Sequence, residues 1–374
     1  MRRPPDWLVE AAVGAVLLSL ALVAVGVWGF TADPARQGQI ITFFQNAIIV
    51  LAVQVYSGNS GILSFGHLAF VGIGAYTAGI LMIDPVLKGA LTGLPAFLQS
   101  AELGFLPATL VAAAVVALVA LFVGLPIVRL SGAAAVIAIL SLVLIANVAF
   151  ANWTGVTRGA GGLFGVPFAT TVAWALVWAI VAVFAARLFK DSATGLQLQA
   201  SREDELAAPS VGVPVRAVRL KAWVLSGALA GVAGAVLAGA LGTVTPSSFF
   251  LQQTFFVIVM LVVGGMATVT GAVVGAGLIT FVQEAVRGYE DRSVDLGPIT
   301  FDRLTGLTQI VLVVLILLVM YLRPEGLVGR YELDETLRAL VRRRRLPAAA
   351  PLEPASSGDL TRPDATVSDQ VAKE

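Results

Sequence analysis

Long apolar segments recur along this chain and constrain its fold more than any other feature. They run at 11–30, 39–57, 62–83, 105–128, 131–150, 169–189, 221–243, 252–286 and 306–322. A helix needs about 20 apolar residues to cross a bilayer, and most of these segments approach or exceed that length. Only 13% of the residues are charged, about half the share in soluble domains. The sequence therefore predicts an all-α polytopic membrane protein with about 9–10 transmembrane or re-entrant helices.

The segment at 252–286 is too long for one span and contains Gly264 and Gly265. It predicts two helices, or a span followed by a re-entrant piece, hinged near Gly264. If the segment 252–286 crosses the membrane twice, most Lys and Arg residues lie on the same side as the N-terminus, including the cluster Arg342–Arg345. The positive-inside rule makes that side cytoplasmic, whereas a single crossing would put the cluster outside. Ten passes with both termini cytoplasmic is the prediction, and nine passes or a re-entrant variant is the alternative.

Composition also divides the chain into two parts. Residues 1–345 hold all of the apolar segments and form the predicted transmembrane domain. The stretch 346–374 is rich in Pro, Ala, Ser and Asp and has few large apolar residues, which predicts a disordered cytoplasmic tail. Within the first part, the polar interval 190–221 is the one sizeable charged loop between apolar segments, and its position in the charge pattern makes it cytoplasmic.

The chain lacks the residues that several functional classes need. The chain has no Cys and a single His, His67, so neither a Cys-based nor a His-based metal site is expected. A net charge of +1 without a basic groove argues against a nucleic-acid partner. No acid–base cluster of an enzyme and no chain of intramembrane charges typical of proton relays appears. We expect no cofactor on this chain.

The polar interval carries helix signals of its own. Ser201 and Asp204 resemble a capping box, and the acidic run 203–205 would then lie at the positive end of a helix. Pro209 interrupts the backbone hydrogen bonding, and Gly212 ends the unit. These residues predict one short helix, either an ordinary connection or a rigid projection that docks a soluble partner.

Uncharged polar residues inside the apolar segments offer a second kind of candidate. The glycine-rich stretch 58–74 predicts a broken helix near a solute path. The candidates for that path are Asn46, Asn59, Ser64, Gly66 and His67. Such side chains equally suit hydrogen bonds between helices, and a lone His is more often a packed, hydrogen-bonded residue. A further motif, with small residues at 227, 231 and 235, predicts a tightly packed helix face.

These motifs, taken in order along the chain, resemble those of a known family, the LivM-type permease subunits of branched-chain amino acid ABC importers. The resemblance covers about residues 40–330. The motifs are GNSGILSFGHLAFVGIGAYTAGIL at 58–81, TRGAGGLFGVP at 157–167, SREDELAAPSVGVPVRAVRLKAWVLSGALAGVAGAVLA at 201–238, TPSSF at 245–249, VGGMATVTGAVVGA at 263–276 and LRPEGLVG at 322–329. The resemblance implies an ABC importer permease fold. It also implies as partners a LivH-type permease, two ATPase subunits that bind the ATP, and an extracytoplasmic solute-binding protein.

The resemblance gives the polar loop a role. ABC importer permeases carry an E-A-A-x-x-x-G loop whose helix docks on the ATPase. Gly212 matches the glycine of this pattern, and Ala207 and Ala208 match its alanines. Leu206 takes the place of the glutamate, with Glu205 one residue earlier, and Pro209 departs from the usual pattern. The resemblance thus implies that residues 201–214 couple this chain to an ATPase.

The expected function is that of a permease subunit for branched-chain or related hydrophobic amino acids in the bacterial plasma (inner) membrane. Within the same family, urea, amides or aromatic acids are alternative solutes. An ion-coupled secondary transporter is the alternative from another class, although the scarcity of intramembrane charge opposes it. Membrane lipid is a further expected partner. The cluster Arg342–Arg345 suits anionic lipid head groups, although a simple topology determinant is the favoured interpretation of this cluster.

Overall fold

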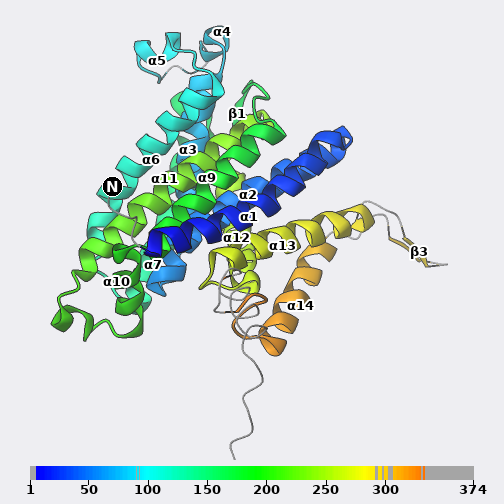
Figure 1. Ribbon diagram of the computed structural model, residues 1–374. Coiled ribbons are helices and arrows are strands. Elements are labelled where there is room, and N and C mark those ends of the chain that lie inside the picture. Colours follow the sequence, from blue (N-terminus) through cyan, green and yellow to red (C-terminus); the bar gives the residue numbers. More distant parts are fainter. Residues whose placement is uncertain are drawn as a thin grey trace, which may run out of the picture. The chain divides into compact units, whose positions relative to one another are not determined.

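The computed structural model describes residues 6–89, 91, 93–290, 294–296, 299–301, 306–329 and 332. The elements in chain order are α1 (Asp6–Thr31), α2 (Pro34–Ser60), α3 (His67–Met82), α4 (Pro85–Lys88), α5 (Ala96–Ser100), α6 (Phe105–Ile127), α7 (Gly132–Asn152), α8 (Thr154–Thr157), η1 (Gly159–Gly161), β1 (Leu163–Phe164), α9 (Val172–Asp191), α10 (Ala193–Glu203), η2 (Ala208–Val211), α11 (Val215–Leu241), β2 (Thr243–Val244), η3 (Pro246–Phe249), α12 (Leu251–Gly264), α13 (Val269–Glu290), β3 (Val294–Leu296), β4 (Ile299–Phe301) and α14 (Leu307–Leu322). Figure 1 shows their arrangement. Residues up to Glu335 belong to one compact unit, and the tail predicted at 346–374 lies outside the described residues.

The all-α membrane architecture is confirmed. Among the described residues, eight helices are long and apolar enough to cross a membrane, and α3 and α14 are two shorter apolar helices. The long segment at 252–286 is two helices, α12 and α13, separated after Gly264 as predicted. Four of these helices, α11 to α14, lie between Lys190 and Glu332, whose side chains form an ion pair. An even number of crossings keeps both residues on one side of a membrane, whereas a single crossing at 252–286 would separate them.

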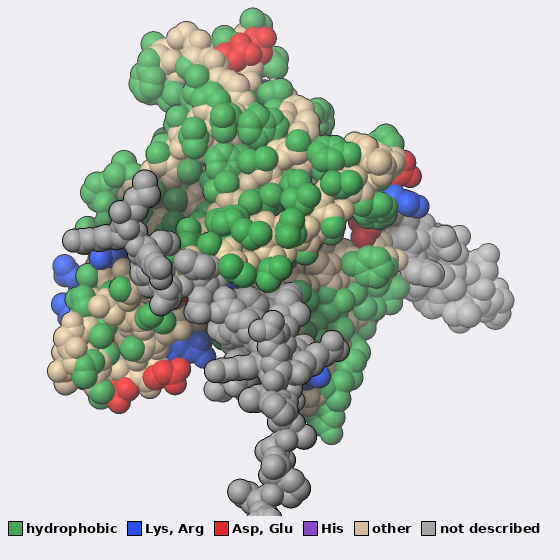
Figure 2. Space-filling view, in the orientation of Figure 1, with side chains coloured by type: hydrophobic (Ala, Val, Ile, Leu, Met, Phe, Trp, Pro, Cys, Tyr) green, Lys and Arg blue, Asp and Glu red, His purple; other side chains and the backbone are tan. Residues whose placement is uncertain are grey.

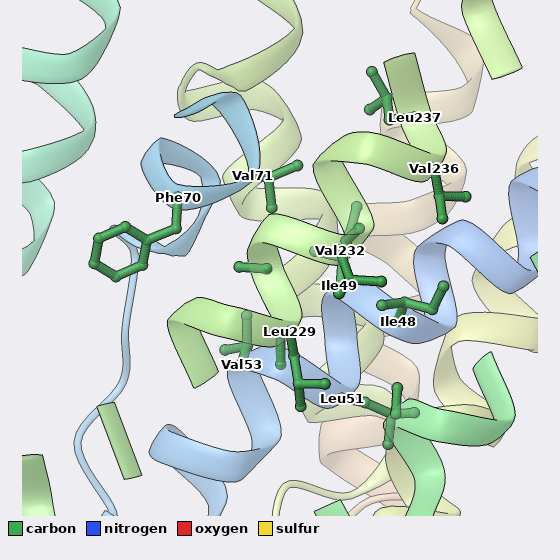
Figure 3. Close-up of a cluster of buried hydrophobic side chains, with 14 of the residues drawn as sticks. Ile48, Ile49, Leu51, Val53, Phe70, Val71, Leu229, Val232, Val236 and Leu237 are labelled. Carbon is green, nitrogen blue, oxygen red and sulfur yellow. The ribbon is translucent and has the colours of Figure 1, made fainter. Parts of the chain in front are cut away.

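Two central helices, α2 and α11, form the middle of the bundle. In their most apolar windows 83% and 72% of the residues are buried, against 28% for α6 and 22% for α7. Side chains of α2, α3 and α11 interlock there, among them Ile48, Val71 and Val232 (Figure 3). Figure 2 shows mainly hydrophobic side chains over the visible face of the helices and charged ones toward its ends. An apolar exterior of this kind suits a bilayer environment.

Glycines allow the central helices to approach closely. A Cβ added at Gly74 of α3 would lie 2.5 Å from the carbonyl oxygen of Gly231 on α11. One added at Gly234 would lie 2.1 Å from the carbonyl oxygen of Val71. On another side of α11, Gly227 and Gly231 meet Ala120 and Ala112 of α6. The packed face predicted from the small-residue motif is therefore confirmed, and it extends to two neighbouring helices.

The predicted break after α2 is also present. Asp33 caps the start of α2 by accepting a hydrogen bond from the Arg36 N–H, and Pro34 occupies its first turn. Gly61 ends the helix in the left-handed conformation (φ 72°), and its N–H donates to the Ser57 carbonyl. Residues 61–66 are not helical, and α3 begins at His67. The glycine-rich motif thus separates α2 from α3.

At the end of the bundle that carries α4 and α5, one lysine is buried. The Lys88 side chain is 0% exposed and donates hydrogen bonds to the carbonyls of Leu98 and Ala101. Two antiparallel pairs, β1 with β2 and β3 with β4, complete the described architecture. The β1–β2 pair places Leu163 opposite Val244 and joins the chain before α9 to the chain after α11.

Candidate functional site

The polar loop between α9 and α11 contains two helical pieces, α10 and η2, at the end of the bundle opposite α4 and α5 (Figure 1). Its geometry corrects the sequence prediction, in which a single helix started at Ser201. The helix α10 starts earlier, after Ser192, whose side chain accepts from the Gly195 N–H. Ser201 lies near the end of α10 and donates its hydroxyl to the Leu198 carbonyl. The acidic run 203–205 therefore follows α10 rather than beginning it.

Long-range contacts of α10 explain the difference. Gln199 donates a hydrogen bond to the side-chain oxygen of Asn59 (3.1 Å), and Arg202 donates to the carbonyl of Gly58 (3.0 Å). Asn59 and Gly58 both lie in the last turn of α2. Backbone carbonyls in that turn, such as the carbonyl of Gly58, have no partner within the helix. Local capping rules contain no information about these partners. The contacts attach α10 to the end of α2.

Asp204 does act as a cap, as its position in the sequence indicates, but it caps the turn that follows α10. Its carboxylate accepts from the backbone N–H groups of Leu206 and Ala207, at 2.9 Å each. The short 3₁₀ helix η2 follows, with Pro209 in its first turn, where the missing N–H of proline has no intrahelical acceptor to lose. Pro209 is thus compatible with this geometry. Gly212 ends η2 with φ 83°, a conformation that favours glycine.

The turn that contains the alanine–glycine motif is held by one ion pair. Glu205 accepts from Arg219 of α11 at 2.9 Å, and the Arg219 side chain is only 4% exposed while that of Glu205 is 41% exposed. Because the guanidinium is mostly buried, water screens this ion pair less than it screens a fully exposed pair. The motif residues therefore stand on a turn that is anchored to a membrane helix.

Apolar side chains project from this otherwise polar loop. Leu206 is 90% exposed and Val211 is 79% exposed. Ala207 and Gly212 are exposed beside them, whereas Ala208 is buried. A Cβ added at Gly212 would meet no atom within 4 Å. The loop thus presents a small apolar surface, formed by 206, 207, 211 and 212, that points away from the rest of the chain.

The candidate path residue His67 is part of a buried hydrogen-bond chain. The Ser226 hydroxyl donates to the carbonyl of Ala52 (2.7 Å), so its oxygen accepts from Nε2 of His67. The bond to Ser226 thus requires a proton on Nε2 of His67. In the neutral ring Nδ1 then accepts from the hydroxyl of Ser64 (2.5 Å), which is the Nε2–H tautomer. The ring of His67 packs within 5.2 Å of the Trp223 ring, centroid to centroid.

The other path candidates are buried as well. Asn46 donates to the hydroxyl of Thr280 on α13 (2.9 Å), and Asn59 donates to the Val55 carbonyl. A Cβ at Gly66 would lie 2.4 Å from the carbonyl oxygen of Ile139 on α7. A cavity of about 370 Å³ is lined by other residues: Met82, Glu102, Leu103, Gly104, Phe105, Pro167 and Ala169. The path assignment stays a prediction, and in this structure its residues join helices.

Sequence reasoning missed a buried charge cluster beside the loop. Glu332 is 2% exposed and pairs with Arg187 (3.0 Å) and Lys190 (2.5 Å), both in the last turns of α9. Burial raises the pKa of this carboxyl group, but the charges of Lys190 and Arg187 outweigh it and hold the pKa below its usual range. No periodicity or motif marks Glu332, because Arg187 and Lys190 lie more than 140 residues away from it in the sequence. The cluster fixes the point where α9 leads into α10.

A bundle of apolar helices with an anchored, partly apolar loop at one end defines a polytopic membrane protein. The family model described as branched-chain amino acid transport system / permease component matches residues 38–320. The chain belongs to this family, whose members are transport components and not enzymes.

Individual relatives agree with that assignment. The chain is 28% identical over 346 residues to the high-affinity branched-chain amino acid transport system permease protein LivM of Escherichia coli K12, covering 83% of this chain and 74% of that one. The LivM protein of Salmonella typhimurium LT2 matches with the same identity and coverage. A probable LivH permease of Methanocaldococcus jannaschii is 27% identical over 36% of this chain and 40% of its own length. No solved structure matches the chain significantly.

Proposed function

We propose that this chain is a permease subunit of an ATP-driven importer for branched-chain or related hydrophobic amino acids. Its partners are two ATPase subunits that bind the ATP, a homologous LivH-type permease and an extracytoplasmic solute-binding protein. The family membership and the transport activity for which the LivM relatives are named support the solute class. The apolar helices support a location in the bacterial plasma membrane. The distribution of Lys and Arg along the chain supports a cytoplasmic side for the loop 190–221 and both termini.

One observation carries the coupling part of the proposal. The loop exposes Leu206 and Val211 beside Gly212 although it is otherwise polar, and such apolar exposure on a charged loop is typical of a protein interface. The loop is also tied to the spans, through Glu205 to Arg219 and through α10 to the end of α2. An ATPase that moves this surface would therefore move α2 and α11, the central helices.

Substitutions at Gly212 test the docking role. Tryptophan there projects into the open space in which an ATPase would sit. Asparagine tolerates a positive φ and adds only a small side chain, so Gly212→Asn is the matched control. If docking loses about 2 kcal/mol, as at an interface hot spot, the affinity for the ATPase falls about 30-fold.

The assay uses the complete complex in proteoliposomes. We expect Gly212→Trp to insert normally but to lose solute-stimulated ATP hydrolysis, and Gly212→Asn to retain it. Normal stimulation in the tryptophan variant would refute the docking role. Uptake that persists without ATP and follows an ion gradient would refute the importer itself. Melting shifts of the partner solute-binding protein with individual amino acids and amides identify the solute.

A further inference from the structure

The junction between α12 and α13 brings two unsatisfied helix ends together. The helix α12 ends at Gly264 and α13 begins at Val269, with four residues between them. The last carbonyls of one helix and the first N–H groups of the other have no partners within their own helices. In apolar surroundings such groups must find partners elsewhere in the protein. The junction therefore requires a second segment.

That segment comes from the end of the described chain. We define the C-terminal strap as residues 323–329 together with Glu332. The N–H groups of Leu327 and Val328 donate to the carbonyls of Val263 and Gly264, at 2.9 Å and 3.1 Å. These bonds occupy the carbonyl end of α12. The strap can come this close to the end of α12 because residue 326 is glycine (φ 85°): a Cβ there would lie 2.6 Å from the Cα of Gly265.

Glu332 occupies the other end of the junction. Its carboxylate accepts from the N–H of Val269 (2.9 Å), the N–H of Thr270 (3.1 Å) and the hydroxyl of Thr270 (2.8 Å). A carboxylate at this position also complements the positive end of the α13 dipole. The same carboxylate pairs with Arg187 and Lys190 of α9. One buried side chain thus joins the start of α13 to the end of α9.

The α9 side of this link leads directly into the loop that we propose docks the ATPase. Lys190 lies two residues before Ser192, the cap of α10, and its carbonyl accepts from Gln199 of α10 (3.1 Å). The junction also touches the end of α2: a Cβ at Gly58 would lie 2.3 Å from the carbonyl oxygen of Met266. The carbonyl of Gly58 in turn accepts from Arg202 of α10. Two sets of contacts therefore connect α10 to the α12–α13 junction.

We propose that the C-terminal strap transmits displacement of α10 to the α12–α13 junction, with Glu332 as the positioning residue that makes the connection. The inference rests on the proposed function, because it requires an ATPase that moves α10. A buried carboxylate that holds two cations and two backbone N–H groups resists separation, since a gap would cost Glu332 its ion pairs with Arg187 and Lys190. The end of α9 and the start of α13 consequently move together.

The test uses variants of the complete complex in proteoliposomes. Glu332→Gln removes the charge that pairs with α9 but keeps an oxygen that can accept from Val269 and Thr270. Glu325→Gln is the comparison variant, since it removes a carboxylate charge from an exposed position of the same strap and leaves the pairs of Glu332 with Arg187 and Lys190 in place. Lys190→Gln weakens the connection from the α9 side and leaves the carboxylate in place. The readout is the number of ATP molecules hydrolysed for each solute molecule imported.

We expect Glu332→Gln and Lys190→Gln each to raise this ratio at least threefold while solute-stimulated hydrolysis persists, and Glu325→Gln to leave it unchanged. The double variant should show no larger effect than either single variant, because both remove one connection. If Glu332→Gln does not insert, Lys190→Gln decides the question.

A wild-type ratio in Lys190→Gln and Glu332→Gln, or an equal rise in Glu325→Gln, would overturn the strap's role while leaving the importer intact. The proposed function fails in a different way: the wild-type complex itself would show no solute-stimulated hydrolysis, which would overturn both proposals.

Discussion

Replacing Gly74 by alanine tests whether backbone contact between α3 and α11 holds the centre of the bundle together. The added Cβ would lie 2.5 Å from the carbonyl oxygen and 2.7 Å from the Cα of Gly231, whereas ordinary van der Waals contact begins near 3.4 Å. The obstructing atoms belong to the backbone, so no side chain can rotate away. The two helices must separate by roughly 1 Å, which disrupts dense packing along their contact.

The magnitude follows from two opposing terms. Overpacking of a well-packed core costs about 1–3 kcal/mol. Alanine recovers about 1 kcal/mol of helix propensity over glycine. We therefore expect a net loss of about 2 kcal/mol in the free energy of unfolding, since a backbone obstruction places the first term near its upper limit. This loss should appear as a lower apparent melting temperature of the detergent-solubilised protein.

Gly38 provides the control, because it lies in α2 and a Cβ there meets no atom within 4 Å. Gly38→Ala should leave the protein as stable as the wild type or raise its stability by up to about 1 kcal/mol. The two substitutions make the same chemical change and are expected to have opposite signs. Wild-type stability of Gly74→Ala would refute the argument that α3 and α11 touch through their backbones.

Two further predictions concern the buried polar groups. Ser226→Ala removes the acceptor of His67 and should cost about 1–2 kcal/mol of stability, whereas Ser19→Ala, at a buried hydroxyl without a partner among the described residues, should cost little; equal losses would contradict the hydrogen-bond chain. The folded-state pKa of Glu332 is lowered, so its stabilisation is fully present above the ordinary value of 4.5 and is lost as pH falls through the folded pKa. The difference in melting temperature between wild type and Glu332→Gln should therefore shrink as pH decreases below 4.5, and a difference that grows instead would contradict the assigned ion pairs.

Hydropathy and glycine spacing predicted the parts of the fold that depend on local pattern. The apolar segments appear as helices, 252–286 divides after Gly264, and the glycine-rich motif separates α2 from α3. The face that contains Gly227 and Gly231 packs closely, as its spacing indicated. These features are local because a helix satisfies its own backbone, so an apolar stretch of sufficient length forms one in a membrane whatever its neighbours are.

The candidate site was predicted only in part. The sequence located the polar loop between the helices, but it placed the helix start at Ser201 instead of after Ser192. The docking role of Ala207, Ala208 and Gly212 stays a prediction. A capping motif describes a few adjacent residues, and the partners that position α10 are Asn59 and Gly58, distant in the sequence. The polar residues of α2 and α3 had two open interpretations, and their hydrogen bonds required the three-dimensional neighbours.

The sequence by itself therefore determined the membrane class, the positions of the apolar segments, the family resemblance and the position of the polar loop. Only the tertiary structure decided which residues hold that loop, how His67 is protonated and why the chain after α14 returns to the α12–α13 junction. The physical reason is the range of the interactions. Helix formation depends on neighbours within a few turns, whereas Glu332 acquires its role from Lys190 and Val269, which only folding brings to its carboxylate.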